Sequence, residues 1–333
     1  MTGKRLVSVL LIAVLIVTAF YVNGIFDKSN VNATPETIIT TYNEIATTSD
    51  EIIIIEDENV PLAQSPLRMP VASGTDVRRN ANVEIDVSNM SDGYVMVRYL
   101  GRGSSNLRVL ITGPNNVTYT YRLRNDGNFE VFPLSVGNGR YTVGVFRNVS
   151  GNQFSTLHSI NINVTLTDEF APFLRPNQFV NFNANTLAVR HAAELIQPND
   201  TTLQKVARIY SFVINNFTYD EQLARTVQSG YVPDLDRVWR ARQGICFDYA
   251  AITTAMLRSQ GIPTRLVIGY VGELFHAWIS VWTEESGWVE GVIYFDGRSW
   301  RLMDPTFAAG ANASQTIMRF IGTGNNHSPR FFH

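Results

Sequence analysis

The chain has 333 residues, of which 45% are hydrophobic and 17% are charged, so it holds enough apolar material for more than one folded core. Its formal net charge of −2 and its pI of about 6.2 provide no global positive field, so nucleic acid is not an expected partner. The single cysteine, Cys246, excludes an intramolecular disulfide and needs an explanation of its own.

The N-terminal residues have the pattern of a targeting segment. Lys4 and Arg5 precede an uncharged apolar stretch over residues 6–22. This pattern is typical of a signal peptide or a short membrane anchor, and the length of the stretch slightly favours an anchor. A buried core helix is the alternative, but the stretch has no polar face. We therefore expect residues 1–26 to be a signal peptide or N-terminal membrane anchor, and the protein to be exported, either anchored facing outside or secreted.

Residues 27–75 are rich in Thr, Ser, Asn and Glu and contain few aromatic side chains. This composition predicts a flexible polar linker that holds the following domains away from the membrane. Within it, the apolar run Ile52–Ile55 is enclosed by acidic residues, which discourage edge-to-edge strand pairing. Docking of this run on a folded domain is the alternative.

Residues 76–170 show short runs in which apolar and polar residues alternate, separated by turn sequences rich in Gly and Asn. The predicted strands are Val83–Val87, Tyr94–Tyr99, Leu107–Ile111, Tyr141–Phe146 and Ile160–Leu166, with more than five strands expected in total. Such a series predicts an all-β sandwich domain. Its Arg and Tyr side chains are an ordinary solvated face or, less favoured, a ligand groove.

Residues 171–333 change to a mixed pattern that predicts an α+β domain. Asn185–Ile196 and Thr202–Asn215 are predicted helices, with Asp200 and Thr201 as candidate caps of the second. A third helix is predicted over Ala251–Gln260, and Cys246 lies just before it. Unpaired backbone N–H groups and the helix dipole at such a position favour the nucleophilic thiolate.

Three predicted strands follow this helix. They span Thr264–Val271, Phe275–Trp282 and Trp300–Met303, so His276 begins the second and Asp304 follows the third. Taken singly, a cysteine, a histidine and an Asp-Pro pair are usually a buried thiol, a core residue and a turn. Together and in this order, a thiol, an imidazole and a carboxylate suit a nucleophile, its base and the group that orients the base.

Four sequence blocks in this order resemble the transglutaminase-like superfamily, the core domain of transglutaminases and related cysteine proteases. The blocks are Gly-x-Cys-x-Asp-x-Ala at 244–250, Gly-Ile-Pro-x-Arg-x-Val at 261–267, His-Ala-Trp at 276–278 and Asp-Pro-Thr at 304–306. The resemblance covers residues 185–307 and implies a papain-like α+β fold. It implies that Cys246 is the nucleophile, His276 the general base and acid, and Asp304 the imidazole's partner.

The same resemblance implies where the oxyanion of the reaction would bind. The backbone N–H of Cys246 is the first candidate donor, because a nucleophile at a helix start directs its own amide toward the developing charge. Tyr219 or Trp239 is a second candidate donor, although packing alone would explain either aromatic side chain.

The predicted function is an exported thiol enzyme that acts on amide bonds of proteins or peptides, including cell-wall peptides, through a thioester. A cysteine peptidase or amidase is favoured; a protein-glutamine amine transferase that cross-links proteins and a noncatalytic surface adhesin or scaffold are the alternatives. No cofactor or metal is expected, because the remaining histidines have no acidic or cysteine partners at ligand-like spacing. These histidines are His158, His191, His327 and His333. The membrane is an expected partner through the N-terminal segment.

Overall fold

The computed structural model describes residues 66–102, 106–272, 274–284, 287–289, 293–295, 300–302 and 327–333. All of them belong to one compact unit, Ile54–His333. The predicted N-terminal segment 1–26, most of the linker with Ile52–Ile55, and Asp304 lie outside the described residues. Within the ranges given, no helix has the length and apolar character needed to cross a membrane.

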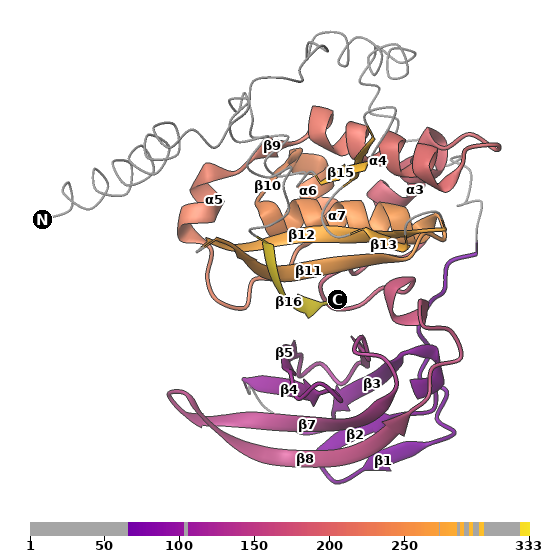
Figure 1. Ribbon diagram of the computed structural model, residues 1–333. Coiled ribbons are helices and arrows are strands. Elements are labelled where there is room, and N and C mark those ends of the chain that lie inside the picture. The colour runs from indigo at the N-terminus through magenta and orange to yellow at the C-terminus, as the bar shows by residue number, and fades with distance from the viewer. Residues whose placement is uncertain are drawn as a thin grey trace, which may run out of the picture. The chain divides into compact units, whose positions relative to one another are not determined.

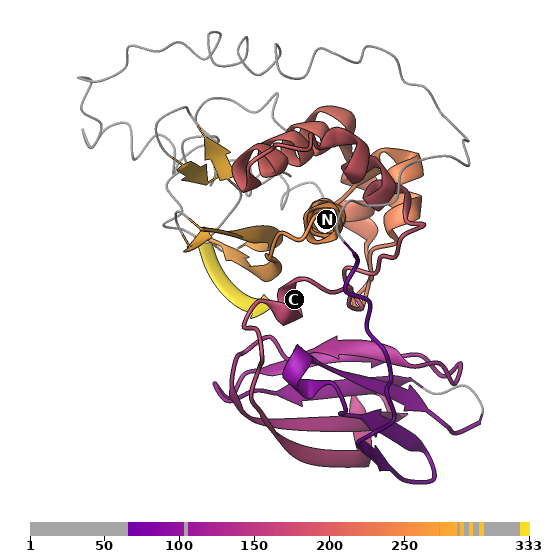
Figure 2. The same cartoon turned by 90° about the vertical axis from the view of Figure 1, so that its right-hand side faces the viewer.

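Residues 77–164 form two four-stranded antiparallel sheets, which face each other in Figures 1 and 2. The sheet orders are β1-β2-β3-β6 and β5-β4-β7-β8. The strands are β1 (Val77–Arg79), β2 (Val83–Asp86), β3 (Tyr94–Tyr99), β4 (Leu107–Thr112), β5 (Thr118–Leu123), β6 (Glu130–Pro133), β7 (Gly139–Ser150) and β8 (Gln153–Val164). A 3-10 turn, η1 (Met90–Asp92), precedes β3.

Alternation along these strands builds one shared core between the two sheets. In β4, Leu107, Val109 and Ile111 are buried, and the residues between them are half-exposed. Side chains from both sheets, such as Val97 and Tyr121, pack in the same apolar cluster. Such a face-to-face arrangement buries the apolar face of each sheet against the other.

A second 3-10 turn, η2 (Ala171–Phe173), follows the sheets and packs against them. Gly93 has φ +83°, and a Cβ there would lie 2.5 Å from the Pro172 ring. A larger residue would therefore both strain the backbone and collide with this turn. The close contact fixes the chain where it leaves the sheets.

The helices of the following region surround one central helix, α7 (Cys246–Ser259). The others are α3 (Leu187–Leu195), α4 (Thr202–Asn216), α5 (Glu221–Thr226) and α6 (Leu235–Ala241). Helix α7 contacts α3, α4 and α6 as well as three strands, and every residue from Asp248 to Ser259 is buried. Thr201 caps α4 as expected, since its side chain accepts the Gln204 amide while Gln204 Oε1 accepts the Thr201 amide.

The main sheet of this region has the order β13-β12-β11-β16 and lies on the other side of α7. Its strands are β11 (Thr264–Val271), β12 (Leu274–Thr283), β13 (Gly287–Val289) and β16 (His327–Phe332). Two small pairs are β9 (Thr218–Tyr219) with β10 (Gln243–Gly244), and β14 (Ile293–Phe295) with β15 (Trp300–Leu302). Strand β16, yellow in Figure 2, comes from the C-terminal end of the sequence and pairs with β11.

Candidate active site

Cys246 is the first residue of α7, and its side chain is half-buried against the core that α7 forms with the sheet. The preceding residue, Ile245, is extended with φ −94° and ψ 176°. The first N–H groups of a helix have no partner within the helix, and the helix dipole adds partial positive charge there. The thiol therefore lies beside N–H groups that can bind an anion.

The segment before Cys246 is paired with β9. Gly244 pairs with Tyr219, and its carbonyl accepts the Asp220 N–H at 2.9 Å. A Cβ at Gly244 would lie 2.6 Å from the Asp248 Cβ, so a side chain there would displace Asp248. The glycine thus allows the Asp248 side chain to fold back over the helix start.

Asp248 is a buried carboxylate in the first turn of α7. Its Oδ2 accepts the Ile245 N–H at 2.9 Å, and its Oδ1 accepts the Tyr231 hydroxyl at 2.6 Å. Arg237 Nη2 lies 3.5 Å from the same Oδ1 and also donates to the Tyr231 hydroxyl. These contacts join the start of α7 to α6 and to the loop before it.

The titration of this group follows from its surroundings. Burial raises the pKa of Asp248 above its ordinary value, against the opposing effects of the Tyr231 hydroxyl, the Ile245 amide and Arg237. Burial and the hydrogen bond to Asp248 raise the pKa of Tyr231. Tyr231 therefore stays protonated and donates its hydrogen bond at neutral pH.

His276 is buried in β12, where it pairs with Gly269 of β11. Its ring stacks near Trp278, with centroids 6.4 Å apart and planes at 21°. Alternate residues of the strand, Ala277 and Ile279, point into the core shared with α7. His276 and Trp278 therefore lie on the face of the sheet that points away from α7.

Cys246 and His276 lie at the same end of the helix and sheet layers. Helix α7 is about 20 Å long at a rise of about 1.5 Å per residue. Strand β11 then runs back toward the start of the helix, and Gly269 is about 17 Å along it from Thr264 at about 3.3 Å per residue. His276, opposite Gly269, is thus level with the start of α7. A contact between thiol and imidazole does not follow from the packing of α7 on β12, and the triad with Asp304 stays a prediction.

The structure separates the two aromatic candidates for the oxyanion. The Trp239 ring is enclosed by packing, since the Arg242 guanidinium lies 3.7 Å from its centroid and Phe212 stacks on it at 5.5 Å. Tyr219 lies in β9 and pairs with Gly244, which is two residues before Cys246 in the chain. Trp239 thus packs in an aromatic cluster, Tyr219 pairs with the segment before the thiol, and both stay candidate donors.

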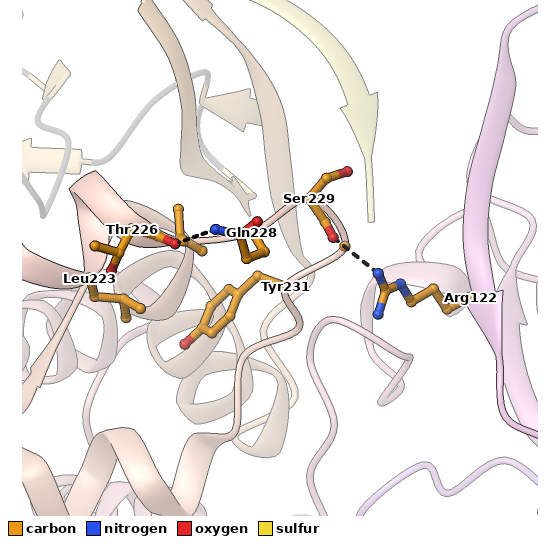
Figure 3. A pocket seen from close by; sticks show the side chains of 8 residues that line it. Arg122, Leu223, Thr226, Gln228, Ser229 and Tyr231 are labelled. Atoms are coloured by element: carbon orange, nitrogen blue, oxygen red, sulfur yellow. Dashed lines mark hydrogen bonds between the residues drawn. The ribbon is translucent and has the colours of Figure 1, made fainter. Parts of the chain in front are cut away.

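We call the hydrogen-bonded residues Asp248, Tyr231 and Arg237 the Asp248 network. A pocket of about 340 Å³ opens beside it (Figure 3). It is lined by Arg122 of β5 and by Leu223, Thr226, Val227, Gln228, Ser229, Gly230 and Tyr231. Sequence analysis missed Tyr231 and Arg237 because they lie in or near a loop without periodicity. The only local signal is Asp234, which caps α6 through the Arg237 amide.

Part of this region matches a known protein family. Residues 190–291 match the model of the transglutaminase-like superfamily, and this range includes Cys246 and His276. An uncharacterized protein of Mycobacterium tuberculosis is 29% identical over 157 residues, which are 43% of this chain. The chain spans 44% of the length of that relative.

Two further likenesses cover other shares of the chain. A protein-glutamine gamma-glutamyltransferase of Pseudomonas aeruginosa is 37% identical over 68 residues, 16% of this chain and 10% of that protein. A solved structure of a proposed cysteine protease from Cytophaga hutchinsonii covers 78% of this chain and 74% of its own, with 14% identity and a TM-score of 0.37. On the family match, residues 190–291 form a transglutaminase-like domain.

Proposed function

We propose that this protein is a transglutaminase-like thiol enzyme that acts on amide bonds of proteins or peptides. Cys246 is the nucleophile, His276 the general base and acid, and Asp304 the group that orients the imidazole. The observation that carries the proposal is the position of the thiol. Cys246 is half-buried at the first residue of the central helix, within the range that matches the transglutaminase-like superfamily.

The proposed reaction has two steps. The Cys246 thiolate attacks an amide carbonyl, and the Cys246 N–H stabilises the oxyanion of the tetrahedral intermediate. His276 then protonates the leaving amine as the C–N bond breaks, which leaves a thioester on Cys246. An acceptor attacks the thioester, gives its proton to His276 and releases the thiolate.

The acceptor decides the name of the reaction. We favour water, which makes the protein a cysteine peptidase or amidase, because amine transfer needs a site that excludes water in favour of an amine. Amine transfer to glutamine is the second candidate, and the short match to the Pseudomonas aeruginosa gamma-glutamyltransferase supports it. In a noncatalytic adhesin, the third candidate, replacing Cys246 would leave partner binding unchanged.

The cellular setting is part of the proposal. The basic residues Lys4 and Arg5 before the apolar stretch 6–22 support export, with the protein anchored on the outer face of the membrane or secreted. An exported enzyme of this class meets extracellular proteins and cell-wall peptides. These are the substrate classes that we propose.

The first experiment measures the rate of iodoacetamide alkylation against pH. Cys246 is the only thiol, so the mass of the intact protein reports its reaction without ambiguity. We expect fast alkylation at about pH 6–7, where a free thiol with its pKa of about 8.5 is mostly protonated. His276→Ala should remove this reactivity, and the matched variant His158→Ala, on β8, should retain it. Slow alkylation of all three proteins would contradict the thiol–imidazole pair.

The acceptor is tested with a glutamine-containing peptide, with and without an added primary amine. Mass spectrometry distinguishes hydrolysis of the side-chain amide, cleavage of the peptide bond and an amine adduct. Cys246→Ala should lose all three products. Product formation by Cys246→Ala would exclude the proposed nucleophile.

A further inference from the structure

The pocket beside the Asp248 network is built by two separate parts of the chain (Figure 3). Arg122 comes from β5, in the β-sheet region that residues 77–164 form. The other lining residues belong to the segment 223–231, which runs from α5 toward α6. The inner wall is Tyr231, whose ring is half-buried. The β-sheet region thus contributes one side chain to a pocket of the transglutaminase-like domain.

Arg122 is held in place from both sides. Its backbone N–H donates to Gln178 Oε1 at 3.2 Å, and its carbonyl accepts Gln178 Nε2 at 2.6 Å. Its Nη2 donates to the Ser229 carbonyl at 3.0 Å. Gly230, at φ +82°, lies so close that a Cβ there would overlap the guanidinium. The glycine therefore provides both the turn and the space that Arg122 occupies.

The charge of Arg122 is not matched by a carboxylate. Arg122 is the one charged side chain among the lining residues, and in the described ranges no carboxylate lies within ion-pair distance of it. By contrast, Arg124, just after the end of β5, lies 3.5 Å from Asp126 and 3.3 Å from Glu130. A guanidinium is a planar fork of N–H donors that fits a carboxylate, and Arg122 uses one of its nitrogens on a carbonyl.

The pocket is adjacent to the proposed nucleophile. Tyr231 donates to Asp248, and the same carboxylate accepts the amide of Ile245, the residue before Cys246. The Tyr231 ring also lies 6.5 Å, centroid to centroid, from Phe247, the residue after Cys246. The pocket wall thus contacts Phe247 and Asp248, the two residues that follow Cys246.

We propose that this pocket is a substrate subsite in which Arg122 binds a carboxylate of a peptide, while Tyr231 and Leu223 contact its apolar part. The proposal rests on the proposed function, because it takes the substrate to be a peptide bound beside Cys246. It assigns to the β-sheet region a direct part in substrate selection. The carboxylate is an acidic side chain or the free C-terminus of the peptide.

The test separates binding from turnover. It uses full-length Cys246→Ala protein, in which no thioester can form, and measures peptide binding by calorimetry. The probes are acetylated and amidated pentapeptides with a central glutamine and one Asp at each other position in turn. Each Asp peptide has a matched control with Asn in place of Asp. One of the Asn peptides is also prepared without C-terminal amidation, so that its only carboxylate is the free C-terminus. Comparing these sets identifies the source of the carboxylate.

We expect one of the carboxylate peptides to bind up to about fivefold more tightly than its neutral match, as an ion pair with an exposed arginine would give. Arg122→Gln should remove this preference, Arg122→Lys should restore part of it, and Arg124→Gln should leave it unchanged. Equal binding of charged and neutral peptides would overturn the proposal. An equal loss in Arg122→Gln and Arg124→Gln would overturn it as well, because any nearby charge would then suffice.

Failure of this subsite and failure of the proposed function give different results. If the subsite is wrong, the alkylation profile of Cys246 and peptide turnover remain as proposed, but charge at the peptide makes no difference. If the function is wrong, wild-type protein shows no thiol activation, and charge-dependent binding to Cys246→Ala can still be measured. Thermal unfolding of each variant shows that the folded protein is being compared.

Discussion

The two regions of this protein bury different kinds of side chain. In the β-sheet region the core is apolar, and the buried charged residues of its strands are Glu84 and Asp86. Around α7, by contrast, polar groups are buried throughout the packing. They include Asp248, Thr253, Thr254, Arg258, Ser259, Thr264, His276 and Ser280, and His333 is buried where the two regions meet, against Tyr119 and Tyr121. Buried polar groups are costly unless hydrogen bonds satisfy them, so this region depends on specific partners.

This difference separates a scaffold from a region suited to chemistry. An apolar core tolerates changes that keep its volume and pattern, whereas a buried polar network fails when one partner is lost. The proposed nucleophile and base both lie in the polar region. The two regions should therefore respond differently to mutation and to pH, and three measurements test that expectation.

The largest expected effect comes from Arg258, at the end of α7. Its buried guanidinium donates to the carbonyls of Thr264, His333 and Arg175 at 2.6–2.9 Å. Burial lowers the pKa of Arg258 to about 9, so it remains charged at neutral pH. Arg258→Ala removes the charge-assisted hydrogen bonds to these three carbonyls, of which the His333 carbonyl keeps the Leu266 amide as a donor. Hydrogen bonds to a charged group contribute about 1.5–3 kcal/mol each, so the free energy of unfolding should fall by about 3 kcal/mol or more.

Urea unfolding of the full chain at neutral pH measures this loss. Arg258→Met is the matched control, because it fills much of the space but makes none of the hydrogen bonds. It should be nearly as unstable as Arg258→Ala, and Arg258→Lys should be intermediate. If Arg258→Met were close to wild type, packing rather than hydrogen bonding would explain the role of Arg258.

The second effect is a dependence on pH that comes from His333. Its buried ring lies among Tyr119, Tyr121 and Phe179, and its Nδ1 is 3.1 Å from the Tyr121 hydroxyl. Burial, helped by the charge of Arg258, lowers the pKa of His333 from 6.5 to about 3. As pH falls below about 6.5, the unfolded chain binds a proton that the folded protein excludes, and stability is lost down to about pH 3.

His333→Phe removes this titration and keeps a ring in the aromatic cluster. Between pH 6 and 4.5 it should lose about 2 kcal/mol less stability than the wild type, at about 1.36 kcal/mol per pH unit. Its stability at pH 7 will be lower, because the bond to Tyr121 is gone. The informative quantity is the slope against pH, and parallel curves for the two proteins would contradict a neutral buried His333.

Elements with strong periodicity could be predicted from the sequence. The alternating run Tyr94–Tyr99 is β3, and the capped run predicted as Thr202–Asn215 is α4, Thr202–Asn216. Strand β5 was missed, since its exposed positions are Thr and Arg and its buried ones are mainly Tyr. Strand β16 was missed because Pro329 argues against a strand. Among the described strands, however, β16 is at the edge of its sheet and pairs with β11, and an edge position tolerates a proline.

The candidate site was predictable only where its signal is local. Gly244, Cys246 and Asp248 stand together in one motif, and α7 begins at Cys246. The partners of Asp248 are separated from it by 17 residues for Tyr231 and 11 for Arg237. No periodic pattern links them, and they meet only through the packing of the α5–α6 loop on the helix start. Tertiary contacts of this kind are not recorded in local sequence.

The smallest expected effect is in the β-sheet region, at the ion pair of Glu84. Arg98 Nη2 donates to both Glu84 carboxylate oxygens at 3.0 and 3.1 Å, and Arg79 lies 3.6 Å from the same carboxylate. The Arg98 side chain is 33% exposed, so solvent screens the pair. Arg98→Met should lower the free energy of unfolding by about 1 kcal/mol or less.

The double variant Arg79→Met/Arg98→Met sharpens this last test. In Arg98→Met, Glu84 keeps Arg79 as a partner, whereas in the double variant it keeps neither arginine. Arg79→Met should therefore lower the free energy of unfolding more in the Arg98→Met background than in the wild type. Urea unfolding of the two single variants and the double variant gives this coupling directly. If Arg98→Met alone destabilised the protein as much as Arg258→Met, the β-sheet region would also depend on a buried charge, and the contrast between the two regions would fail.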